Sequence, residues 1–145
     1  MANQNRFTLV MGTKTYSSWS IRPWLTLRIV TKSASSTFTE IVLPVAGAGS
    51  FNPAYDAAIR RYSPSGKVPL LQDNVTGIYV WDSLAISEYL AEVFPQERLW
   101  PVDAKARAFA RAICAEMHAG FTALRSAMPM HLKKKLAPGE FQVFF

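Results

Sequence analysis

The order of strand-like and helix-like segments over the first 94 residues constrains the fold more than any other feature of this chain. Four short runs rich in β-branched and aromatic residues are predicted strands: 6–12, 37–43, 68–72 and 78–81. Three stretches with apolar residues at helical spacing are predicted helices: 21–31, 53–62 and 83–94. The predicted order is therefore β-α-β-α-β-β-α, with a loop over 44–52, a turn over 63–66 and a hairpin loop over 73–77.

Two βαβ-like halves followed by a hairpin and a closing helix follow the plan of thioredoxin-like α/β domains. We therefore expect an α/β domain over residues 1–94 and a linker over 95–102. Asp103 then caps a helix whose apolar stripe continues at helical spacing until Pro129. The stripe comprises Phe109, Ile113, Met117, Phe121, Leu124 and Met128. It must be covered by the first domain, by further helices or by another chain, and residues 103–145 are predicted to be an incomplete all-helical domain.

Pro23 limits where the first helix can begin, because proline is tolerated only in the first helical turn. With Ser20 as the N-cap, Pro23 takes the third helical position. Ser17 and Ser18 then lie in the preceding loop, near the positive end of the helix dipole. Their hydroxyls either serve capping alone or donate to a thiolate, and lowering a thiol pKa by about 2 units needs about 2.7 kcal/mol.

Two dipeptides separated by one hairpin are candidate ligand contacts. Val68-Pro69 is either an ordinary proline at a strand start or a cis bond that presents the backbone of Val68 to an extended peptide. Asp82-Ser83 is a good helix N-cap, and the same helix terminus would also suit an α-amino acid group, with Ser83 facing the carboxylate and Asp82 the ammonium. Because only the hairpin separates them, the two dipeptides must be neighbours.

Charge and composition limit the classes of binding partner that this chain can have. The net charge is +6, and part of the excess is the run of Lys133, Lys134 and Lys135, which is typical of a solvated helix end and lacks the interleaved aromatic residues of a nucleic-acid site. One cysteine, Cys114, excludes an intrachain disulfide, and no metal-ligand cluster accompanies it. With neither an apolar run of about 20 residues nor a signal peptide, we expect a cytoplasmic protein without membrane or nucleic-acid partners.

Three motifs in this order resemble the glutathione transferase family. Ser-x-x-Ser-x-Arg at Ser17, Ser20 and Arg22 is similar to the activating-serine motif of the bacterial, serine-type zeta- and theta-like classes. The other two motifs are Lys67-Val68-Pro69, similar to the family's cis-proline motif, and Asp82-Ser83, similar to its acid–serine motif. The resemblance implies glutathione as co-substrate without a metal.

The resemblance also implies a role for each site residue. Ser17, with Ser18 in reserve, would hold the glutathione thiolate, and Val68, followed by a cis-Pro69, would hold the cysteinyl backbone. Lys67 would contact the glycyl carboxylate, and Asp82-Ser83 would bind the γ-glutamyl end.

The sequence departs from the family at two places. Asp82 stands where a longer Glu or Gln is common. The family's helical domain also continues for several helices more, so we expect a truncated product that lacks most of the second-substrate site. Phe121, Met128 and Met130 are either remnants of that site or core residues.

The leading functional hypothesis is conjugation of glutathione to small electrophilic apolar substrates, by a homodimer when full length. One alternative is a glutathione-dependent isomerase of the maleylacetoacetate type, in which Arg22 binds an acidic substrate. The other is a truncated glutathione-binding protein without turnover, in which the helix stripe drives association.

Overall fold

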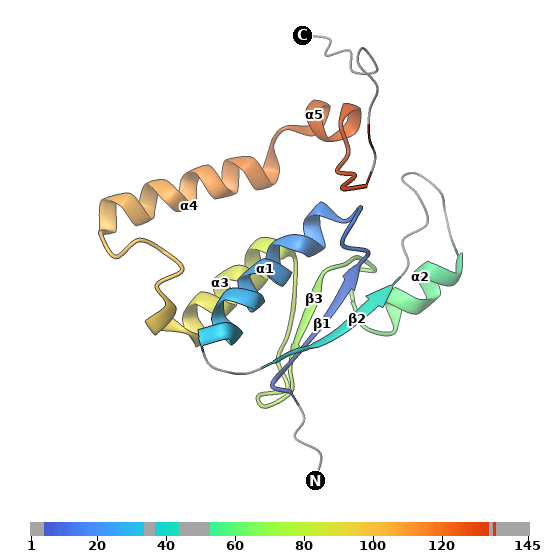
Figure 1. The fold of residues 1–145 in the computed structure, drawn as a ribbon, viewed down its shortest axis with the longest axis horizontal. Coiled ribbons are helices and arrows are strands. Elements are labelled where there is room, and N and C mark those ends of the chain that lie inside the picture. Colours follow the sequence, from blue (N-terminus) through green and yellow to red (C-terminus); the bar gives the residue numbers. More distant parts are fainter. Residues whose placement is uncertain (1–4, 34–36, 44–52, 134, 136–145) are drawn as a thin grey trace.

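The computed structural model describes residues 5–33, 37–43, 53–133 and 135, and these form a mixed four-stranded sheet flanked by helices and followed by two further helices (Figure 1). The elements are β1 (Phe7–Gly12), α1 (Ser18–Ser33), β2 (Thr39–Leu43), α2 (Pro53–Arg60), β3 (Leu70–Asp73), β4 (Tyr79–Trp81), α3 (Ser83–Val93), a 3-10 turn (Pro95–Glu97), α4 (Ala104–Ala119) and α5 (Thr122–Ala127). The predicted α/β class and element order are confirmed. The predicted loop over 44–52 and Lys134 lie outside the described residues.

The sheet has the strand order β2-β1-β3-β4. β1 pairs with β2 in parallel and with β3 in antiparallel fashion, and β3 pairs with β4 across the predicted hairpin. Because successive side chains of a strand face opposite sides, β1 serves two cores. Phe7, Leu9 and Met11 belong to the cluster under α1 and α3, whereas Val10 belongs to the cluster under α2.

Asp73 anchors the hairpin although its side chain is fully buried. It accepts hydrogen bonds from the Arg6 guanidinium at 2.9 Å, from the Tyr89 hydroxyl at 2.9 Å and from the Val75 N–H at 3.0 Å. Burial by itself would raise the pKa of Asp73, but these donors, together with the Thr76 N–H, hold it below its ordinary value. The carboxylate therefore ties the first strand, the hairpin and α3 together.

Helix α1 begins three residues earlier than predicted. Ser17 caps it, because the Ser17 hydroxyl oxygen accepts the Ser20 N–H at 3.3 Å. Ser20 is fully buried, and its hydroxyl oxygen accepts the Gly12 N–H at 3.0 Å. The prediction that Ser20 is the N-cap was wrong, since Ser20 serves the end of β1. Pro23 consequently lies inside the helix, which lacks the hydrogen bond that its N–H would make.

The prediction that the long apolar stripe belongs to one continuous helix was wrong, since the structure divides it between α4 and α5. Asp103 caps α4, since its carboxylate accepts the Ala106 N–H at 2.7 Å, but α4 ends at Ala119. Gly120 closes the last turn with its N–H donated to the Glu116 carbonyl at 2.8 Å, and a Cβ at Gly120 would lie 2.8 Å from that oxygen. Phe121 then adopts a φ of 62° before α5 begins. The chain therefore turns at this point.

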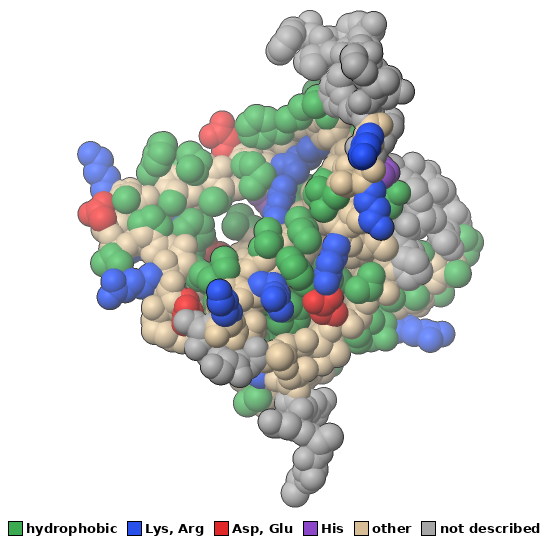
Figure 2. Space-filling view, viewed as in Figure 1, with side chains coloured by type: hydrophobic (Ala, Val, Ile, Leu, Met, Phe, Trp, Pro, Cys, Tyr) green, Lys and Arg blue, Asp and Glu red, His purple; other side chains and the backbone are tan. Residues whose placement is uncertain are grey.

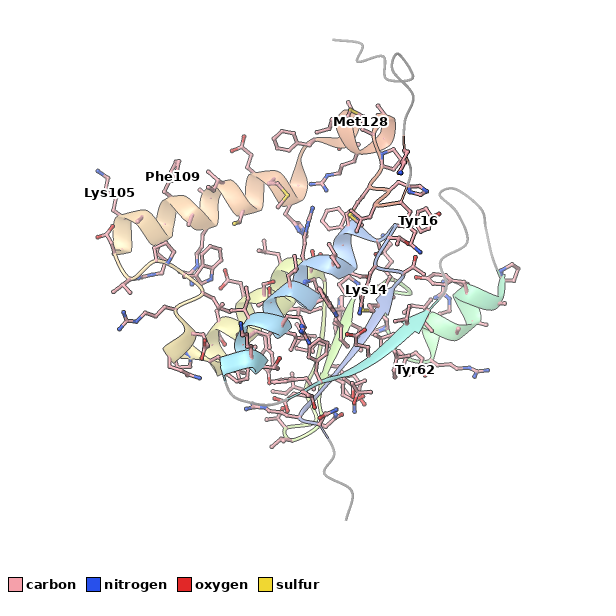
Figure 3. All side chains as sticks on the ribbon, in the orientation of Figure 1. Lys14, Tyr16, Tyr62, Lys105, Phe109 and Met128 are labelled. Carbon is pink, nitrogen blue, oxygen red and sulfur yellow. The ribbon has the colours of Figure 1, made fainter. Side chains whose placement is uncertain are left out.

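No residue of α4 or α5 is buried. Apolar side chains gather along the outer surface of both helices (Figure 2), and Phe109 projects away from the α/β domain (Figure 3). None of the helices in the described ranges has the length and apolar character to cross a membrane.

Candidate functional site

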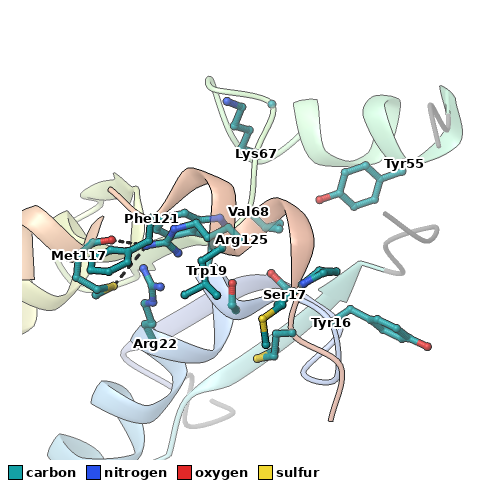
Figure 4. A pocket seen from close by; sticks show the side chains of 16 residues that line it. Tyr16, Ser17, Trp19, Arg22, Tyr55, Lys67, Val68, Met117, Phe121 and Arg125 are labelled. Carbon is teal, nitrogen blue, oxygen red and sulfur yellow. Dashed lines mark hydrogen bonds between the residues drawn. The ribbon is translucent and has the colours of Figure 1, made fainter. Parts of the chain in front are cut away.

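An open cleft of about 770 Å³ lies between the α/β domain and the helices that follow it (Figure 4). One wall comes from the start of α1 and the segment before β3, the other from the end of α4, from α5 and from the residues after it. The chain after α5 returns to the loop before α1, where the Leu132 N–H donates to the Thr15 carbonyl at 3.1 Å. Lys67, Val68 and Trp19 also line an adjoining cavity of about 470 Å³.

The two candidate dipeptides meet in this adjoining cavity, as their spacing predicted. It is lined by Lys67, Val68 and Pro69 on one side and by Asp82 and Ser83 on the other. The Val68-Pro69 bond is cis, as the family resemblance implied, so the alternative of an ordinary trans proline is wrong. The structure therefore brings together five of the seven predicted site residues here.

Asp82 is the N-cap of α3, as predicted. Its Oδ1 accepts the Leu84 N–H at 2.8 Å, and its Oδ2 lies 3.1 Å from Nε2 of His118 on α4. The backbone of Asp82 has a φ of 78°, which turns the chain sharply into the helix.

The hydroxyl of Ser83, which also lines this cavity, is buried and unsatisfied. Ser83 is only 2% exposed, and its Oγ has no hydrogen-bond partner among the described residues. A buried hydroxyl without a partner costs about 1–3 kcal/mol, so this position fits a polar ligand group. Asp82 already accepts the N–H groups of Leu84 and Ala85, so an anionic ligand at this position would gain mainly from the positive end of the α3 dipole.

The remaining two predicted residues, Ser17 and Ser18, line the larger cleft at the start of α1. The Ser17 hydroxyl donates to Oγ of Ser20 at 2.9 Å, whereas the Ser18 hydroxyl makes no hydrogen bond within the described part of the chain. The first N–H groups of α1 have no intrahelical acceptor, so the cleft is electropositive at this point. Either hydroxyl lies where a ligand thiolate would gain from that field.

Phe121, Met128 and Met130 line the cleft opposite these serines. Phe121 is 56% exposed and Met128 is 38% exposed, so neither belongs to a core. The second-substrate interpretation of their position remains a prediction.

Several residues of the cleft were not predicted from the sequence. Tyr55, on α2, faces the cleft (Figure 4), and burial raises the pKa of its phenol. The Trp19 indole lies 4.3 Å from the Arg22 guanidinium carbon, 4.6 Å from that of Arg125 and 5.1 Å from the His118 ring. The contact between Trp19 and Arg22 joins neighbouring turns of α1, whereas no local pattern signals the contacts with Arg125 and His118, which come from elements far along the chain.

Comparison with known proteins agrees with this geometry. Residues 16–93 match the family model of the glutathione S-transferase N-terminal domain. Glutathione S-transferase GstB of Escherichia coli is 37% identical over 79 residues, which are 52% of this chain and 38% of that protein. A probable maleylacetoacetate isomerase of Caenorhabditis elegans is 36% identical over 81 residues, 56% of this chain and 37% of that protein. The chain thus spans well under half the length of these relatives.

Solved structures share the fold over most of the described chain. A glutathione transferase homologue from Sulfitobacter with bound glutathione has a TM-score of 0.61 at 21% identity, over 86% of this chain and 55% of that one. The theta class enzyme of Xanthomonas axonopodis pv. citri, also with glutathione bound, has a TM-score of 0.52 at 25% identity, over 86% of this chain and 54% of that one.

Proposed function

The chain belongs to the glutathione S-transferase family, and from this premise we propose that its cleft binds glutathione and directs the thiolate at small electrophilic apolar substrates. In this proposal the tripeptide lies extended along the backbone of Val68. Its γ-glutamyl end contacts Asp82 and Ser83, and Lys67 pairs with its glycyl carboxylate. The observation that carries the proposal is the buried Ser83 hydroxyl, which has no partner among the described residues and lines the same cavity as Val68.

The conjugation reaction needs a stabilised glutathione thiolate and an electrophilic carbon held close to it. The glutathione thiol loses its proton to solvent, and Ser17 donates a hydrogen bond to the resulting thiolate after releasing Ser20. The first N–H groups of α1 add their positive field. The thiolate then attacks the electrophilic carbon, a C–S bond forms, and the leaving group departs with its electron pair. Phe121 and Met128 offer the apolar surface for the second substrate.

Glutathione affinity tests the binding half of the proposal. In calorimetric titration, Ser83→Ala should weaken glutathione binding about 10-fold, the size expected for one hydrogen bond to a charged group. Ser87→Ala is the matched control, since Ser87 lies one turn later on α3 and its hydroxyl donates to the Ser83 carbonyl at 3.1 Å. Equal affinity of the wild type and Ser83→Ala would remove Ser83 from the site.

The thiol pKa of bound glutathione, followed by the ultraviolet absorbance of the thiolate, tests the catalytic half. Ser17→Ala should raise this pKa by about 1–2 units while the affinity for glutathione changes little. Because Ser17 also caps α1, its loss should lower stability by about 1 kcal/mol. Ser18→Ala serves as the comparison. A shift only in that variant would assign the donor role to Ser18, and a shift in neither would exclude both.

A second candidate function is glutathione-dependent isomerisation of a cis-alkene acid. It is supported by Arg22 in the cleft and by the similarity to the probable maleylacetoacetate isomerase. Turnover of a maleyl-type acid in preference to a chloronitrobenzene-type electrophile would favour it. Glutathione binding with turnover of neither would instead indicate a binding protein.

A further inference from the structure

Two guanidinium groups meet at one end of the cleft, and neither forms an ion pair with a carboxylate of the described residues. Arg22 comes from the second turn of α1 and Arg125 from α5, and both lie against the indole of Trp19 (Figure 4). Both also line the cleft that holds Ser17. Two like charges beside one ring repel each other, so their proximity needs a compensating group.

Of the two guanidinium groups, that of Arg22 has the less complete set of hydrogen-bond partners. Its Nη1 is buried without a hydrogen-bond partner, and no carboxylate of the described residues pairs with its guanidinium. Asp82 is the nearby acid, but its oxygens already face His118 and the N–H of Leu84. Burial and the charge of Arg125 lower the pKa of Arg22, which Asp82 opposes only partly. A partly desolvated guanidinium in this state favours an anionic ligand.

The hydrogen-bond partners of Arg125 among the described residues are all neutral. Its Nε donates to the Gly120 carbonyl at 3.0 Å, and one Nη donates to the Met117 carbonyl. These bonds fix the guanidinium at the C-terminal end of α4 and leave its charge uncompensated by any described carboxylate. The group is therefore held in place before a ligand arrives.

The pair lies next to the proposed glutathione contacts, in the same cleft as Lys67 and Val68. Neither arginine lines the cavity of about 470 Å³ that holds Asp82, although Arg22 and Ser83 both line a further cavity of about 330 Å³. Along α1, Arg22 lies about 7.5 Å beyond Ser17, since five residues rise 1.5 Å each. Phe121 and Leu124 provide apolar surface in the same cleft. A molecule that spans this distance carries an apolar body with an anion at its far end.

We propose that Arg22 and Arg125 form a carboxylate subsite for the second substrate, which is an aryl or arylalkyl electrophile bearing a carboxylate. This inference rests on the proposed function. An anionic electrophile would be repelled by the glutathione thiolate, and the two cations offset that repulsion. In the reaction of a (halomethyl)benzoate, the thiolate forms the C–S bond at the benzylic carbon, halide leaves with the electron pair, and the carboxylate stays unchanged on the arginines.

Two product analogues that differ only by the carboxylate test the subsite without requiring turnover. These are S-benzylglutathione and S-(4-carboxybenzyl)glutathione, titrated by calorimetry against the full chain. The wild type should bind the carboxylated conjugate about 10-fold more tightly, as a charge-assisted hydrogen bond predicts. Arg22→Gln should abolish this preference and leave the affinity for S-benzylglutathione within about 2-fold. Arg125→Gln should reduce the preference, with circular dichroism as the check that α4 and α5 persist.

Arg28→Gln is the matched control, because Arg28 is an exposed arginine on the same helix that lies over Trp24. It should keep the full preference. Equal binding of both conjugates by the wild type, or a preference that survives in Arg22→Gln, would overturn the subsite while leaving the proposed function intact. Equal weakening of both conjugates in Arg22→Gln would place Arg22 on glutathione itself and also overturn it. Failure of the wild type to bind either conjugate would contradict the proposed function.

Discussion

The α/β domain and the helices α4 and α5 use the same apolar residue types in opposite ways. Phe7 in β1 is 1% exposed, whereas Phe109 in α4 is 68% exposed. In the α/β domain, strands and helices cover each other's apolar faces, and in the second region one helix face has no covering element among the described residues. Periodicity alone therefore shows which face is apolar, while burial depends on an available partner surface.

The cleft lies where these two regions meet, and its walls differ accordingly. Val68 and Ser83 belong to the packed domain, so the proposed glutathione contacts are held by a closed core. Phe121 and Met128 stand on the exposed helices. One wall is thus organised before any ligand binds, and the other has far less packing to hold it.

The largest expected difference in the free energy of unfolding comes from a Leu→Ala substitution made once in each region. Leu71→Ala should lower the free energy of unfolding by about 3 kcal/mol, because Leu71 is fully buried under α1 and α3. Leu124→Ala should change it by at most about 0.5 kcal/mol, since Leu124 is 51% exposed. Urea unfolding measures both. A comparable loss in Leu124→Ala would show that the helix face is covered in solution and would erase the contrast.

A somewhat smaller effect is expected at the buried carboxylate of the first region. Asp73→Asn should destabilise the protein by about 2 kcal/mol at neutral pH, because it removes the charged partner of Arg6. The pKa of Asp73 is lowered in the folded state, so this contribution is complete above about pH 3.9, the unfolded value, and is lost as the pH falls through the folded pKa. Urea unfolding across this pH range should show the two proteins converging in acid. A constant difference would contradict the assigned charge state.

The smallest effect is expected on the outer face of α4. Phe109→Ser should leave the free energy of unfolding within about 0.5 kcal/mol, since the ring packs on no core (Figure 3). Sedimentation of the two proteins at equal concentration gives the complementary measurement. If the exposed stripe drives association, Phe109→Ser should form a smaller fraction of oligomer than the wild type. A large loss of unfolding free energy in Phe109→Ser would instead show that this face of α4 is covered.

Much of the fold was predictable because its signals are local. The hairpin at 73–77 follows from turn residues between two β-rich runs, and Asp82 and Asp103 are caps in the structure as their position before apolar periodic runs predicted. The start of α1 was not predictable in this way. Ser17 and Ser20 are equally good caps, and the N–H of Gly12 at the end of β1 decides between them.

The residues of the candidate site also divide into those that local signals predict and those that depend on contacts between distant segments. Lys67, Val68, Pro69, Asp82 and Ser83 could be grouped from the sequence, because one hairpin joins their elements and the family resemblance gave each a role. Trp19, Arg125 and His118 could not, because their contacts join α1 to helices about a hundred residues later. The break at Gly120 was missed as well, since its apolar neighbours keep helical spacing through the turn.

The sequence by itself determined the order of the elements and the neighbouring placement of the cis-proline and acid–serine dipeptides, since each depends on residues close together along the chain. Only the tertiary structure decided that the Ser83 hydroxyl is buried with no partner in the described part of the chain, that Ser17 caps α1, and that Arg22 and Arg125 share one indole. Burial, hydrogen-bond satisfaction and the balance of charge depend on every group that surrounds an atom, and those groups are assembled only when distant segments fold together.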